Sequence, residues 1–154
     1  MRKSVLFVTI ALVSLVWGSL LIADDEMVVP LGEITLEPLG GEGKRSEVVF
    51  PHGVHFSYNC QTCHHKWGGQ APIVGCTTSG CHDLETAPKT EDGKPVKDPD
   101  VQIRYFKKAY HDMCIGCHKE IKQQNKLLEA SKAALGEELP ASGPTSCNAC
   151  HPKE

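Results

Sequence analysis

The sequence predicts a mostly α-helical protein with a large share of irregular chain and a small β-hairpin near its N-terminus. Three observations predict this fold class. Two stretches between residues 101 and 135 carry helix signals, and two short β-prone segments before residue 51 flank a glycine-rich turn. Much of the remaining chain is proline, glycine and polar residues. At 154 residues, the chain is long enough for one domain rather than two.

The N-terminal segment has the pattern of a signal peptide. Two basic residues precede an apolar run over residues 5–22, and the small residue Ala23 is followed by an acidic segment. We therefore assign residues 1–23 to a cleaved signal peptide that directs export to the periplasm, and residues 24–154 to a single domain. The apolar run is also just long enough to be retained as a membrane anchor, which is the alternative.

The first elements of the domain are expected to form the hairpin. Residues 28–36 and 47–50 are β-prone, and the turn between them contains Gly40, Gly41 and Gly43. A polar loop with three prolines then occupies residues 86–100.

Two helices follow this loop. Asp100 is a candidate cap for a helix over residues 101–113. A second helix is expected over residues 114–135, ending at Gly136. Its apolar residues recur every seven positions, which indicates ordinary packing, or a partner helix as the alternative. Its lysines indicate a solvated face, with a docking patch near the third cysteine pair as the alternative: Lys119, Lys122, Lys126 and Lys132.

The charge of the exported chain limits its partners. Removal of residues 1–23 takes two basic residues and no acidic residue, so the formal net charge changes from −3 to −5. This charge disfavours nucleic acid and anionic membrane surfaces, and it favours basic proteins.

Eight cysteines form four pairs, and each second cysteine is followed by a histidine. The second pair has four intervening residues and the others have two. C-x-x-C-H is the attachment signature of c-type haem, because two thioether bonds hold the porphyrin and place the next imidazole under the iron. The sequence therefore predicts four c-type haems, at Cys60, Cys63 and His64 (first motif), Cys76, Cys81 and His82 (second), Cys114, Cys117 and His118 (third), and Cys147, Cys150 and His151 (fourth).

Two other readings explain the cysteines less well. A disulfide framework suits an exported chain of this size, but it gives no reason for a histidine after each pair. Structural zinc bound by two Cys₄ sites would leave the histidines without a role.

The remaining histidines match the remaining need for iron ligands. Four low-spin haems need four second axial ligands, and four histidines are left: His52, His55, His65 and His111. Methionine is the rival ligand, but the exported chain has only two methionines.

Some pairings are excluded by distance. His64 and His65 have Cα atoms about 3.8 Å apart, too close for opposite faces of one iron. Two histidines seven residues apart on a helix, His111 and His118, lie about 10 Å apart on one face and cannot hold one haem between them. The same argument assigns two different irons to the histidines of the H-x-x-H segment, His52 and His55.

The order of these motifs over residues 52–151 resembles class III cytochrome c, the tetrahaem cytochrome c3 family of sulfate-reducing bacteria. The order is His-x-x-His, C-x-x-C-H-H, C-x₄-C-H, a lone histidine and two further attachment motifs. The resemblance implies a compact fold organised around the haems. It also implies that His52 completes the haem of the first motif, His65 that of the second, His55 that of the third and His111 that of the fourth.

The chain departs from the commoner basic members of that family. Its last motif has a two-residue spacer, His111 lies only three residues before Cys114, and the charge is acidic. These features resemble the acidic, type II members. That resemblance implies a donor that is a basic type I cytochrome or hydrogenase, a membrane-bound redox complex as acceptor, and a role in sulfate respiration. The departures disfavour fast direct exchange with hydrogenase.

Two imidazoles on every iron leave no position for a reactant. This indicates a low-potential electron carrier that is not an enzyme and has no small-molecule substrate. The alternative is a multihaem reductase of a metal or nitrogen oxyanion, which needs an iron with a vacant position. With nine aromatic residues in the chain, a peptide core would be thin, so we expect the haem-free chain not to fold.

Overall fold

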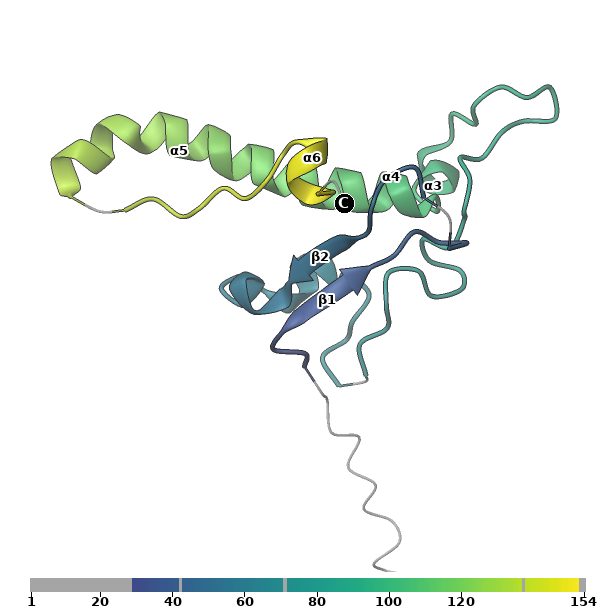
Figure 1. Ribbon diagram of the computed structural model, residues 1–154, viewed down its shortest axis with the longest axis horizontal. Coiled ribbons are helices and arrows are strands. Elements are labelled where there is room, and N and C mark those ends of the chain that lie inside the picture. Colours follow the sequence, from purple (N-terminus) through teal and green to yellow (C-terminus); the bar gives the residue numbers. More distant parts are fainter. Residues whose placement is uncertain (1–28, 42, 71, 137, 153–154) are drawn as a thin grey trace, which may run out of the picture.

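The computed structural model describes residues 29–41, 43–70, 72–136 and 138–152 (Figure 1). The predicted signal peptide lies outside these residues, as does the start of the predicted first strand at Val28. Within the described ranges, no helix is both long and apolar enough to cross a bilayer.

The predicted hairpin is present. Strands β1 (Glu33–Leu36) and β2 (Val48–Pro51) pair antiparallel. On one face, Ile34 lies opposite Phe50 and Leu36 opposite Val48, and these four side chains are half-buried. The alternate residues are exposed, as the period of two requires for a sheet with one covered face. β1 is shorter than the predicted 28–36 segment, and the turn uses the positive φ of Gly40 and Gly41, 86° and 80°.

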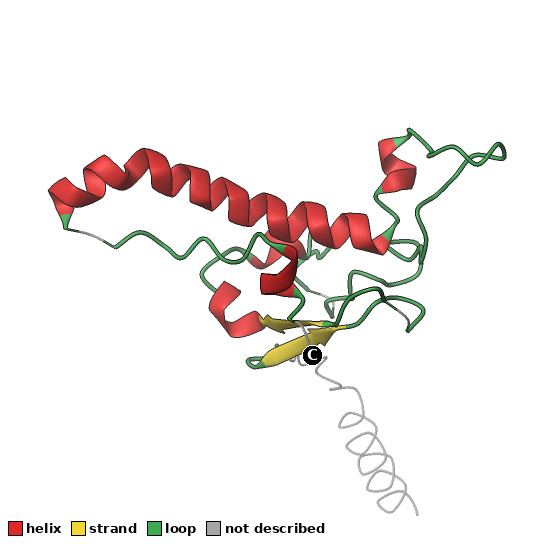
Figure 2. Ribbon diagram, turned by 45° about the horizontal axis from the view of Figure 1, so that its top comes forward, coloured by secondary structure: helices red, strands yellow, loops and turns green. Residues whose placement is uncertain are grey.

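Three short helical turns carry ligand candidates. The 3₁₀ helix η2 (His52–His55) follows β2 directly. Helices α2 (Cys60–Cys63) and α6 (Cys147–Cys150) are each one turn made by a cysteine pair and its spacer. Both views of the molecule place α6 between the long helix and the hairpin (Figures 1 and 2).

The first predicted helix begins earlier and is shorter than expected. Helix α3 (Pro99–Gln102) is capped by Asp98, whose side chain accepts the N–H of Asp100, so the prediction of Asp100 as the cap was wrong. Pro99 suits the first helical position because its fixed φ is helical and no N–H is needed there. The chain leaves the helix at residues 103–105.

The second helical stretch begins at Phe106 rather than at residue 114. Helix α4 (Phe106–Tyr110), the π-helical segment η3 (His111–Ile115) and helix α5 (Gly116–Leu135) follow without a break. The stretch ends at Gly136 with φ +68°, as predicted. Figure 1 shows α5 as the longest element, with residues 138–146 returning beside it, and Asn125 donates to the Pro140 carbonyl there.

The polar loop predicted over residues 86–100 is confirmed for residues 86–98, whereas its last two residues, Pro99 and Asp100, belong to helix α3. Residues 86–98 form a projecting turn without helix, held by a hydrogen bond of 2.8 Å from the Thr90 N–H to the Lys94 carbonyl. The overall class is therefore the predicted one: helices, one small hairpin and much irregular chain.

The polypeptide by itself has almost no core. Among the described residues, Ala109 is the only buried hydrophobic side chain, and it is 9% exposed. Larger apolar side chains such as Phe56 and Val54 are 45% and 69% exposed. Burial of apolar surface is the main force that folds proteins, so these elements need another apolar body between them.

Candidate functional site

The histidine rings lie in four pairs, and every one of the eight histidines belongs to one pair. Each pair joins one histidine of a cysteine motif to one of the four remaining histidines. The ring centroids are separated by 6.4 Å for His52 and His64, 5.9 Å for His65 and His82, 6.3 Å for His55 and His118, and 6.4 Å for His111 and His151.

These separations fit one metal ion between two rings. Metal–nitrogen bonds of about 2.0–2.1 Å, with about 1.2 Å from each ring centroid to its nitrogen, place the centroids of two opposed imidazoles about 6.4 Å apart. The four pairs are the ones that the sequence resemblance implies. Neighbours in sequence such as His64 and His65 turn to different partners, as the distance argument requires.

Hydrogen bonds orient five of the rings. In each case ring nitrogen Nδ1 faces a backbone carbonyl oxygen at 2.6–3.1 Å, so this nitrogen carries the proton and the lone pair of Nε2 is available to a metal ion. The donor–acceptor pairs are His52 with Pro30, His55 with Pro51, His82 with Ile103, His118 with Pro144 and His151 with Ser46. Sequence reasoning missed all five carbonyls, because any residue can supply one.

Burial favours the neutral form of two further rings. Burial, and then the nearby His52, lowers the pKa of His64 below its ordinary value. Burial, followed by the charges of Lys107 and His151, lowers the pKa of His111. A neutral imidazole is the form that binds a metal ion, so both shifts suit ligation.

The motif histidines keep one backbone position despite different spacers. The N–H of His64 bonds to the carbonyl of Cys60 at 2.9 Å, and that of His151 to Cys147 at 2.8 Å. In the second motif, with its four-residue spacer, the N–H of His82 still reaches the carbonyl of Cys76, at 3.1 Å. The longer spacer therefore bulges outward, and the histidine stays beside the first cysteine.

An ion pair follows the second motif directly. Asp83 accepts hydrogen bonds from the N–H of Gly80 at 2.8 Å and from the guanidinium of Arg104 at 2.7–3.1 Å. The Gly80 N–H, and then Arg104, lower the pKa of Asp83 below its ordinary value. The sequence shows that Asp83 directly follows the Cys-His end of the second motif, but it does not show that Arg104, 21 residues away, is its partner.

At least one cysteine of each motif lies near Cys114. Burial raises the pKa of the Cys114 thiol to about 11, with further contributions from Cys63, Cys150, Cys76 and Cys117. Those neighbours belong to all four motifs, so the attachment points lie close enough to influence one another electrostatically.

A glycine faces the ring of the third motif. Gly143 has φ +71°, and a Cβ at this position would lie 2.6 Å from Nε2 of His118. Only a residue without a side chain leaves room beside this nitrogen.

The cysteines and histidines fit c-type haem better than the alternatives. None of the eight cysteines, all of which lie in the described chain, forms a disulfide. No group of three or more His, Cys, Asp or Glu side chains in the described residues is placed to hold a metal ion by itself. Pairs of imidazoles suit haem, because the porphyrin supplies the other four iron ligands. A porphyrin would also be an apolar body against which the exposed large apolar side chains could pack.

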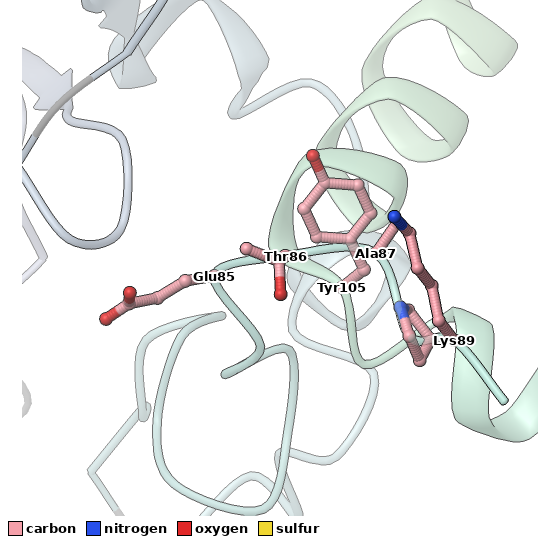
Figure 3. A pocket seen from close by; sticks show the side chains of 6 residues that line it. Glu85, Thr86, Ala87, Lys89 and Tyr105 are labelled. Carbon is pink, nitrogen blue, oxygen red and sulfur yellow. The ribbon is translucent and has the colours of Figure 1, made fainter. Parts of the chain in front are cut away.

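One further hollow lies away from these residues. An open pocket of about 570 Å³ is lined by residues 85–89 and Tyr105, and Figure 3 shows the side chains of Lys89 and Tyr105 next to Ala87. Its lining includes no histidine or cysteine, so it is separate from the candidate haem sites.

This combination of four cysteine-pair motifs, four opposed imidazole pairs and a missing peptide core defines a multihaem c-type cytochrome. Comparison with known proteins specifies the family. The profile of the class III cytochrome c family matches residues 33–151, so the chain belongs to that family. It carries four c-type haems and is a multihaem electron carrier with redox partners.

Two relatives identified by sequence, both named cytochrome c3, agree with this assignment. The chain is 32% identical over 124 residues to cytochrome c3 of Desulfovibrio desulfuricans, covering 80% of this chain and 96% of that protein. It is 31% identical over 129 residues to cytochrome c3 of Maridesulfovibrio salexigens, covering 81% and 96%. A solved structure, cytochrome c3 from D. desulfuricans Essex 6, matches at 28% identity with a TM-score of 0.37, covering 81% of this chain and 98% of that one.

Proposed function

We propose that the protein is a periplasmic, low-potential electron relay in which every haem iron is bound by two histidines. The single observation that carries the proposal is the pairing of the eight rings at 5.9–6.4 Å, with none left over. In this proposal the eight cysteines attach the haems, and the pairs supply the axial ligands: His52 and His64, His65 and His82, His55 and His118, His111 and His151.

When bound at these sites, haem would supply one-electron exchange between ferric and ferrous iron. The chain supplies both axial positions, so neither a substrate nor water has a place to bind. The carbonyls that accept from Nδ1 make the imidazoles more electron-rich, which stabilises the ferric state and lowers the potential. Partial exposure of the rings to water also stabilises the ferric state and lowers the reduction potential.

Visible spectroscopy combined with a redox titration of the purified, secreted protein tests this proposal. We expect four haems per chain, low-spin spectra in both oxidation states, and no carbon monoxide complex after reduction. A high-spin band or carbon monoxide binding would identify an open iron. Either result would overturn the relay and favour the oxyanion reductase.

We further propose export with cleavage of residues 1–23. The basic start, the apolar run and the small residue before an acidic segment support this proposal. N-terminal sequencing of the secreted protein should begin at Asp24, and a mature chain that retains Met1 would contradict cleavage.

For partners, we propose a basic type I cytochrome or hydrogenase as donor and a membrane-bound redox complex as acceptor. The net charge of −5 after cleavage supports a basic donor. Three carboxylates of the hairpin region are exposed and available to such a partner: Glu33, Glu37 and Glu47.

The salt dependence of electron transfer tests the donor. Reduction by a basic cytochrome should slow as ionic strength rises, because salt screens the attraction that steers encounter. A rate that rises with salt would instead indicate an acidic donor.

A further inference from the structure

Arg104 is not a haem ligand, yet it occupies a fixed place beside the second motif. Its Nη2 lies 2.7 Å and 2.9 Å from the two carboxylate oxygens of Asp83, and its Nε lies 3.1 Å from one of them. The side chains are 44% and 20% exposed, so the pair is partly shielded from water. A planar guanidinium bonded to both oxygens has a defined orientation, unlike an ammonium group.

The backbone of Arg104 is joined to the same segment. Its carbonyl accepts the N–H of Leu84 at 2.9 Å, and the N–H of Phe106 reaches the carbonyl of Leu84 at 3.2 Å. The preceding residue, Ile103, supplies the carbonyl that Nδ1 of His82 contacts at 2.7 Å. These bonds divert the backbone at residues 103–104 from helix formation, which is why α3 ends before α4 begins.

Three consecutive residues, at positions 82–84, therefore bind the segment 103–106. The histidine uses its ring, the aspartate its carboxylate, and the leucine its backbone. Of the three, only Asp83 contacts this segment through a bond between two side chains, its carboxylate and the guanidinium of Arg104.

Asp83 also controls the long spacer. Its second oxygen accepts the N–H of Gly80, whose φ of +84° turns the chain back toward Cys81. The carboxylate of Asp83 thus connects Gly80, at the end of the spacer, to Arg104. In the sequence, His82 lies between Gly80 and Asp83.

We propose that Arg104, acting through Asp83, is a positioning residue that fixes the imidazole of His82 over the haem of the second motif. The inference rests on the proposed ligation by His82. It extends that proposal by naming the groups that hold the ring against the carbonyl of Ile103. Without the guanidinium fork, the two segments are joined only by the backbone bonds of Leu84 and by the bond of the His82 ring itself, and the ring gains rotational freedom.

The test uses the full holoprotein and three variants, Arg104→Lys, Arg104→Gln and Asp83→Asn. Arg104→Lys keeps the charge and loses the fork, so it separates positioning from electrostatics. Lys94→Gln is the matched control, because it removes an exposed ion pair with Asp92 in the projecting loop, away from the histidines. The readout is the proton nuclear magnetic resonance spectrum of the ferric protein, in which the haem methyl shifts report the orientation of the axial imidazole planes.

We expect all three variants to lose the native methyl shifts of the haem attached at Cys76 and Cys81, and to keep those of the other three haems. Lys94→Gln should keep all four sets. Native shifts in Arg104→Lys, together with altered shifts in Arg104→Gln, would show that the pair acts by charge alone and would overturn the inference. Native shifts in all variants would overturn it as well.

The proposed ligand set is tested separately by His82→Met. If His82 ligates the iron, this variant gives a histidine–methionine spectrum at one haem. If it leaves the native spectrum intact, the ligand assignment fails, whatever Arg104 does. Should Arg104→Gln not assemble four haems, Arg104→Lys decides the question, because it preserves the charge balance of the segment.

Discussion

Replacement of Gly143 by alanine should disturb one haem and leave the other three intact. A Cβ at this position would lie 2.6 Å from Nε2 of His118 and 2.7 Å from two neighbouring ring atoms. Ordinary contact needs about 3.4 Å or more, so the ring or the backbone must move by about 0.8 Å. A metal–nitrogen bond of about 2.0 Å cannot stretch by that amount, so His118 must tilt or the segment around residue 143 must shift.

The chain provides a matched control at Gly136. Both glycines have positive φ, +71° at residue 143 and +68° at residue 136, but nothing lies within 4 Å of a Cβ built on Gly136. Alanine at either position pays a conformational penalty of about 1 kcal/mol. Overpacking against His118 should add about 1–3 kcal/mol in Gly143→Ala alone.

Electron paramagnetic resonance of the ferric protein and thermal unfolding measure the two effects. Gly136→Ala should show four native low-spin signals and a small decrease in midpoint temperature. Gly143→Ala should show an altered signal for the haem of the third motif and a larger decrease. Identical spectra and midpoints for the two variants would refute the argument, because they would place the Cβ in open space.

Three further predictions address the pairing, the haems and the projecting loop. His65→Met should change the spectrum and potential of the haem attached with His82 and leave that of its sequence neighbour His64 unchanged; an effect on the His64 haem in a site-resolved redox titration would contradict the pairing. Protein produced without haem maturation should show no cooperative transition by circular dichroism, because the described chain has one buried apolar side chain; a sharp transition would show an independent core. Hydrogen bonds from Lys94, and then from Thr90, hold the pKa of Asp92 below its ordinary value of about 3.8. They therefore stabilise the loop above about pH 3.8, and this contribution is lost as the pH falls through the lower pKa of the folded state. The protection of the Gly93 N–H against exchange, relative to an unfolded chain at the same pH, should therefore fall in acid in the native protein but not in Asp92→Asn. If this protection changed with pH in the same way in both proteins, Asp92 would not stabilise the loop.

The local elements were largely predictable because their signals are local. The alternation around Ile34 and Phe50 and the glycine at 136 define the hairpin and the end of the long helix within a few residues of chain. The break at residues 103–105 was not predictable, since it depends on the carbonyls of Ile103 and Arg104 bonding to residues 82 and 84. The cap of α3 was misplaced by two residues because Asp98 and Asp100 both suit a cap, and only the position of Pro99 decides between them.

The candidate site divides in the same way. Four cysteine motifs and eight histidines are countable in the sequence, so the number and type of cofactor followed from covalent chemistry alone. The carbonyl acceptors, the Arg104 contact and the space beside Gly143 were invisible there. Except for the contact of His55 with the Pro51 carbonyl four residues away, each of these joins residues more than 20 positions apart, and no residue type in the sequence indicates it.

The amino-acid sequence by itself determined that this chain binds four c-type haems and has few residues with which to build a core. Distance arguments excluded some imidazole pairs and the family resemblance implied the full set, but only the tertiary structure brings each pair together and shows what holds each ring in place. The physical reason is that covalent attachment depends on adjacent residues, whereas two rings opposed at 6 Å depend on how distant segments pack around a shared body.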